Sequence, residues 1–126
     1  SRIEAYRKIS LIRNYEDVLD VSDELIDRYG DMPRPVSSLL SVSLIRSLGS
    51  SCGINKIQNK SGAVLYYPRL MDQKIWIELA KRNNGRYLTS LASVPYVQEK
   101  ISGSDKMLQN IVKTLSEYLK LLSADT

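Results

Sequence analysis

The chain has 126 residues, of which 43% are apolar and 25% charged, a composition typical of one globular domain with its own core. Its formal net charge is +4, and no apolar run approaches the ~18 residues that a membrane helix needs. It has no histidine and one cysteine, Cys52, which excludes histidine-dependent catalysis and an intrachain disulfide. We expect residues 1–126 to form a single soluble, cytoplasmic domain without membrane contact. The start at Ser1 inside a helical pattern suggests a piece excised from a larger multidomain protein.

The first third of the chain is predicted to be helical. Apolar residues at steps of three and four predict helices at 2–13, from about Val18 to Tyr29, and at 35–50. The second helix should end at Tyr29, because Gly30 can adopt the left-handed conformation and Pro33 cannot continue a helix. One stripe of this helix is expected to face the core: Val18, Val21, Leu25 and Tyr29.

After Gly53 the sequence changes to short β-prone runs. The predicted elements are strands at 54–59 and 63–67, a helix at 72–82, strands at 86–91 and 96–101, and a last helix that Ser104 or Asp105 can cap. Helices followed by small antiparallel strands and further helices give an α+β fold, because a doubly wound sheet would alternate strand and helix throughout. Trp76 and the eight tyrosines could stack on bases, but without phenylalanine we expect them to fill the core.

The second predicted helix carries an unusual charge. Residues 16–31 hold seven acids and one base, a net charge of −6, which leaves +10 on the rest of the chain. Five of the acids, here called the acidic face, point away from the apolar stripe: Glu16, Asp20, Asp23, Glu24 and Asp27. Such a face can simply be solvated, but one sign of charge sustained over three turns also favours docking to an arginine-rich surface.

The motifs of common enzymes are absent from the sequence. It has neither of the glycine-rich phosphate-binding patterns, and Cys52 has no histidine to activate it, so we expect it to be a small half-buried filler. Acids on one exposed helix face do not converge on Mg²⁺. We therefore expect no catalytic, cofactor-binding or metal-binding residue in this chain.

Several short runs in the first half of the chain form a recognisable set. They are Arg2–Ile9, Asp23–Gly30, Pro33, Pro35, Val36, Leu39, Leu40, Leu48, Gly49, Gly53 and Ile54. In this order they resemble the C-terminal domain of the bacterial transcription-repair coupling factor, over roughly the first 65 residues.

The resemblance implies a regulatory interaction domain of an ATP-driven translocase on duplex DNA, with ATP and Mg²⁺ bound in other domains. The parent protein of that family displaces RNA polymerase stalled at lesions and recruits nucleotide excision repair. Its C-terminal domain docks on an N-terminal module similar to the excision-repair helicase and masks the surface for the damage-recognition ATPase. Glu24 matches the acidic position of that contact. By helical geometry Asp20, Asp23 and Asp27 lie close enough to share it.

The basic residues are also compatible with a different class of function, which is nucleic-acid binding. Two groups could follow phosphates in a non-specific nucleic-acid accessory module: Arg2, Arg7, Lys8 and Arg13, and Lys81, Arg82 and Arg86.

Overall fold

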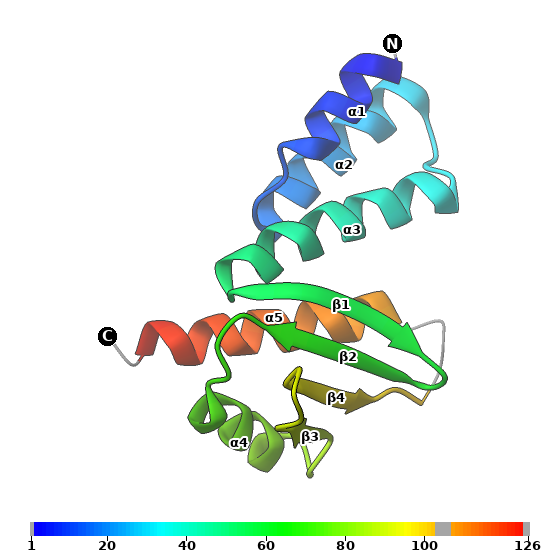
Figure 1. Cartoon of the computed structure of the whole chain (residues 1–126). Coiled ribbons are helices and arrows are strands. Elements are labelled where there is room, and N and C mark those ends of the chain that lie inside the picture. Colours follow the sequence, from blue (N-terminus) through cyan, green and yellow to red (C-terminus); the bar gives the residue numbers. More distant parts are fainter. Residues whose placement is uncertain (1, 103–106, 125–126) are drawn as a thin grey trace. The chain divides into compact units, whose positions relative to one another are not determined.

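The computed structural model describes residues 2–102 and 107–124, which fall into two compact units, Ser1–Leu48 and Gly49–Thr126 (Figure 1). The described elements confirm the α+β prediction. They are α1 (Arg2–Ser10), α2 (Tyr15–Tyr29), α3 (Arg34–Ser51), β1 (Ile54–Lys60), β2 (Ala63–Pro68), α4 (Gln73–Arg82), β3 (Tyr87–Ser90), β4 (Tyr96–Lys100) and α5 (Met107–Ala124). None of the described helices is long and apolar enough to cross a membrane. That residues 1–126 form one domain of a longer protein stays a prediction.

Local hydrogen bonds define both ends of α2. The Asn14 side chain accepts from the Asp17 backbone N–H at 2.8 Å and caps the first turn. At the other end Gly30 has a φ of 84°, and its N–H donates to the Ile26 carbonyl at 2.8 Å. The end of α2 at Tyr29 is confirmed. The first helix is shorter than predicted, because the Arg13 N–H donates to the Asp17 carboxylate instead of continuing α1.

The core of the first unit is a small apolar layer between its helices. Its buried side chains are Ile9, Ile12, Leu25, Leu40, Leu44 and Ile45. The Ser43 hydroxyl donates to the Ile9 carbonyl at 2.6 Å, which ties α3 to the end of α1. Tyr29, which was predicted to face the core, is exposed, and so is Leu39 of α3. Tyr29 ends α2 at the rim of a pocket, and Leu39 lies beside the buried stripe of α3 rather than on it.

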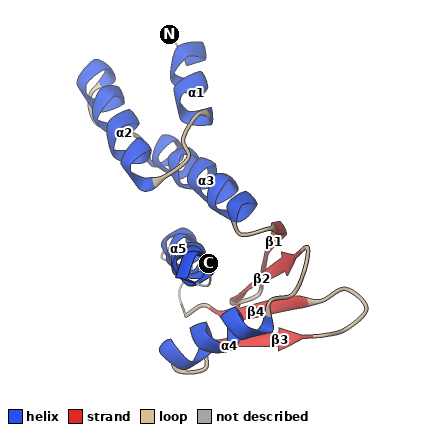
Figure 2. Cartoon of the chain, turned by 90° about the vertical axis from the view of Figure 1, so that its left-hand side faces the viewer, coloured by secondary structure: helices blue, strands red, loops and turns tan. Residues whose placement is uncertain are grey.

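The second unit is built on an antiparallel sheet with strand order β1-β2-β4-β3. Ser61 and Gly62 both have positive φ in the turn between β1 and β2, as a two-residue hairpin loop requires. The register places Val64 and Tyr87 on either side of Glu99, so their side chains share one face of the sheet. Figure 2 shows α5 beside the sheet. The predicted cap of this helix at Ser104 or Asp105 lies outside the described residues.

The aromatic residues of this unit form a core cluster around Trp76. Its ring centroid lies 5.6 Å from that of Tyr66, 5.8 Å from that of Tyr87 and 5.2 Å from that of Tyr118. All four side chains are buried, so β2, β3, α4 and α5 meet at one aromatic centre. For these four residues the expectation of a core role is confirmed, but it is wrong for Tyr6, Tyr15 and Tyr29, which are exposed. Cys52 is also buried, and burial raises the pKa of its thiol to about 12.

A carboxylate is buried beside this cluster. Glu99 is 1% exposed, and it accepts hydrogen bonds from the Tyr66 hydroxyl at 2.6 Å and the Thr114 hydroxyl at 2.9 Å. Since Thr114 gives its only hydroxyl proton to Glu99, the Tyr87 hydroxyl must donate to Thr114 at 2.7 Å. Arg86 Nε lies 2.8 Å from the second carboxylate oxygen. Desolvation nevertheless raises the pKa of Glu99 above its ordinary value.

This raised pKa predicts a specific pH dependence of folding. The native state holds the Glu99 proton more tightly than the unfolded state, so its stabilising effect is full below the ordinary pKa of 4.5 and is lost as pH rises through the native pKa. We expect the free energy of unfolding of the wild type to fall relative to that of Glu99→Gln over this window. Urea unfolding of both proteins between about pH 4 and 8 measures the difference. Two parallel pH profiles would contradict the prediction.

Candidate functional site

The acidic face lies on the outer side of α2. All five of its side chains are exposed, while Leu25 is 6% exposed and lies in the core of the unit. Asp17 belongs to the same helix but is half-buried and serves the α1–α2 connection through its bond from Arg13. The acids of the face therefore point where a partner can reach them, as the helical period predicts.

Two ion pairs between α1 and α2 set the electrostatics at one edge of this face. Lys8 Nζ donates to Glu24 Oε1, and the Arg28 guanidinium lies 3.3 Å from the Glu4 carboxylate. The hydrogen bond from Lys8, assisted by the charges of Lys8 and Arg28, holds the pKa of Glu24 below its ordinary value. Within residues 16–31 the sequence has one base, Arg28, and the structure adds Lys8 of α1. The basic face of α1 and the short connection to α2 were the signal for this pairing.

The remaining predicted contact residues are not compensated in this way. Asp20, Asp23 and Asp27 are exposed and form no ion pair with another residue in the described parts of the chain. The structure thus separates Glu24, which already has a cation, from three carboxylates that face solvent. Negative charge close to α2 is available to a cationic partner at these three positions.

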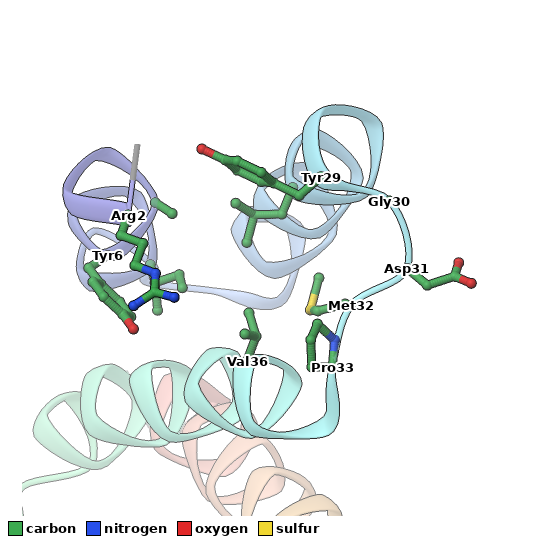
Figure 3. A pocket seen from close by; sticks show the side chains of 11 residues that line it. Arg2, Tyr6, Tyr29, Gly30, Asp31, Met32, Pro33 and Val36 are labelled. Carbon is green, nitrogen blue, oxygen red and sulfur yellow. The ribbon is translucent and has the colours of Figure 1, made fainter.

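Two hollows border the helices of the first unit. One, of about 260 Å³, lies beside the Lys8–Glu24 pair and is also lined by Asp17, Asp20 and apolar residues of both helices. The other, of about 470 Å³, is shown in Figure 3, where Arg2 and Tyr6 of α1, Tyr29 of α2, Met32 and Val36 line it. No group of three or more histidine, cysteine, aspartate or glutamate side chains in the described residues could hold a metal ion.

Some of the basic residues considered for nucleic-acid binding form ion pairs within the chain. Lys8 pairs with Glu24, Arg82 with Glu78 and Arg86 with Glu99. The remaining members of the two groups are exposed: Arg2, Arg7, Arg13 and Lys81. Three of the seven cations thus have an acidic partner of their own, which weakens the attraction for phosphate.

The chain thus has an α+β fold, and its uncompensated negative charge lies on the exposed face of α2. The TRCF domain model matches residues 1–78, and the chain belongs to this family, as the resemblance predicted. The transcription-repair-coupling factor of Staphylococcus aureus (strain USA300) is 35% identical over 60 residues, 48% of this chain and 5% of that protein. The factor from Staphylococcus epidermidis is 34% identical over 64 residues, 51% of this chain and 6% of that protein. The chain thus spans about one twentieth of these curated relatives.

A solved structure extends the likeness of the fold to nearly the whole chain. The C-terminal domain of a transcription-repair coupling factor superposes with a TM-score of 0.85 at 19% identity, over 98% of this chain and 82% of that one. The sequence resemblance was weak after roughly residue 65, whereas the fold is shared beyond it.

The Lys8–Glu24 pair predicts a measurable shift in one titration. In Lys8→Met the Glu24 carboxylate loses its hydrogen-bond donor, so its pKa should rise toward the ordinary value of 4.5. The carboxyl carbon of Glu24, followed by NMR against pH, reports this value. Arg7→Met is the matched control, since it removes one positive charge from an exposed position of the same helix. Equal shifts in both variants would show that the direct pair is not the cause.

Proposed function

We propose that this chain is a regulatory docking domain of a transcription-repair coupling factor. In this proposal the acidic face binds an N-terminal module of the same polypeptide that resembles the excision-repair helicase. Docking masks the surface of that module for the damage-recognition ATPase, so the domain is autoinhibitory. The observation that carries the proposal is the outward row of uncompensated carboxylates at Asp20, Asp23 and Asp27, beside Glu24 at the position that the family resemblance assigns to this contact.

An exposed electrostatic contact suits a reversible switch. Ion pairs that stay partly hydrated contribute little individually and weaken with salt, so a competing interaction can open the contact. Glu24 is a further control point, because a partner's arginine must displace or share the Lys8 ammonium. The docked and open states then differ by a modest free energy that another ligand can overcome.

We infer that the parent protein uses ATP and Mg²⁺ in other domains to translocate on duplex DNA and displace stalled RNA polymerase, and that it acts in the cytoplasm in nucleotide excision repair. This chain contributes no catalytic group to that reaction in the proposal. Its role is to control when the repair machinery is recruited.

Charge reversal tests the docking directly. Glu24→Arg, and more strongly its combination with Asp27→Arg, should weaken binding of the N-terminal module by about tenfold or more, because like charges then face each other across the contact. Titration calorimetry with the isolated module measures the affinity, and circular dichroism checks the fold. Glu78→Arg is the matched control. Glu78 is also a helical glutamate with one ion-pair partner, and its side chain is 42% exposed against 43% for Glu24.

The full-length protein gives the second readout. There Glu24→Arg should raise the affinity for the damage-recognition ATPase, because the masked surface is available more of the time. If the interdomain contact is lost and this affinity stays the same, the domain is not an autoinhibitor. If Glu78→Arg weakens docking as much as Glu24→Arg, the effect is net charge and not the acidic face.

A non-specific nucleic-acid accessory module is the alternative, and the exposed cations Arg2, Arg7, Arg13 and Lys81 are the observation in its favour. We expect duplex DNA to bind only at about micromolar concentration or weaker at ~0.15 M salt, because the cations are dispersed and α2 repels phosphate. Fluorescence anisotropy with labelled duplexes measures this. Nanomolar binding would favour the alternative over the docking domain.

A further inference from the structure

Two large apolar side chains stand exposed on the outer side of α2. Leu19 is 47% exposed and Ile26 is 45% exposed, although both lie in the middle of a regular helix. They are seven residues apart, which places them two turns apart on the same side of the helix. Neither belongs to the apolar stripe of α2 formed by Val18, Val21, Leu25 and Tyr29.

The acidic face borders these two side chains directly. Asp23 follows Leu19 by four residues and precedes Ile26 by three, so it lies between them along the helix. Asp20 and Asp27 each adjoin one of the two apolar residues in sequence and lie one step further round the helix. The outer surface of α2 is therefore a mixed row of two apolar side chains and three uncompensated carboxylates.

We propose that Leu19 and Ile26 are the apolar anchors of the docking surface, and that the partner is a basic protein surface with an apolar contact between its arginines. The inference rests on the proposed function and deepens it. Protein interfaces place apolar side chains at the centre and charges around them, and an amphipathic helix commonly docks through anchors at this spacing. In this arrangement the anchors supply affinity, and the carboxylates select and orient the partner.

Charge complementarity identifies the occupant. Residues 16–31 carry a net charge of −6, so α2 repels nucleic acid and anionic lipid. The same surface of a second copy of this chain would bring like charges together. A protein surface that carries arginine or lysine around an apolar contact satisfies both parts of the row.

The anchors predict how docking responds to salt. Salt screens the exposed ion pairs but leaves the burial of apolar side chains intact. Part of the affinity for the N-terminal module should therefore persist at about 0.5 M salt in the wild type, and this part should vanish when the anchors are removed.

The decisive experiment titrates this 126-residue chain with the N-terminal module of its own full-length protein. The variant Leu19→Ala with Ile26→Ala should bind at least about tenfold more weakly and lose the salt-resistant part. Alanine favours the helix, and both sites are exposed, so the fold is preserved, as circular dichroism should verify. Ile77→Ala is the control, because Ile77 is likewise an exposed isoleucine in a helix, at 51%.

Two contrary outcomes separate the inference from the proposed function. If the double variant binds as Ile77→Ala does, while Glu24→Arg still weakens docking, the anchors are wrong and the electrostatic docking stands. If neither the double variant nor Glu24→Arg changes binding, the proposed function fails and the inference fails with it. Binding of a second copy of the chain, seen by light scattering and lost in the double variant, would instead overturn the choice of partner.

Discussion

The burial of Leu25 on one side of α2 is the constraint on which the candidate site depends. With this side chain in the core, the 3.6-residue period places every member of the acidic face outside. Asn14 caps the start of α2 and Gly30 caps its end, so the helix spans the segment that contains the acidic face. The candidate site is therefore a consequence of how one amphipathic helix packs.

Charge compensation then divides the acids into two kinds. Lys8 reaches Glu24 from α1, and Arg28 of α2 reaches Glu4, so the two helices are joined by a pair of exposed contacts of opposite polarity. Asp20, Asp23 and Asp27 form no ion pair with these cations. Part of the negative charge of α2 is thus paired within the chain, and the rest is exposed to solvent. Exposed charges of this kind form weak, reversible ion pairs, as the proposed docking requires.

The second unit contains a buried carboxylate. Its buried Glu99 accepts hydrogen bonds from Tyr66 and Thr114 and lies against the Arg86 guanidinium, and these contacts offset part of the cost of burying a carboxylate. These partners come from β2, α5 and the residue before β3, and their geometry specifies how these parts of the unit meet. Such a network makes the second unit a well-defined scaffold, and it has no counterpart on the acidic face, where every contact is exposed.

The sequence by itself determined the described helices and strands to within a few residues, the end of α2 at Tyr29, and the outward direction of the acidic face. All of these follow from local conformational preference and from the period of the apolar residues. Only the tertiary structure decided that Lys8 meets Glu24 across 16 residues, that Tyr66 meets Glu99 across 33, and that Tyr29, Leu19 and Ile26 stay exposed. These features depend on which elements pack together, and a periodic pattern along one helix contains no information about its neighbours.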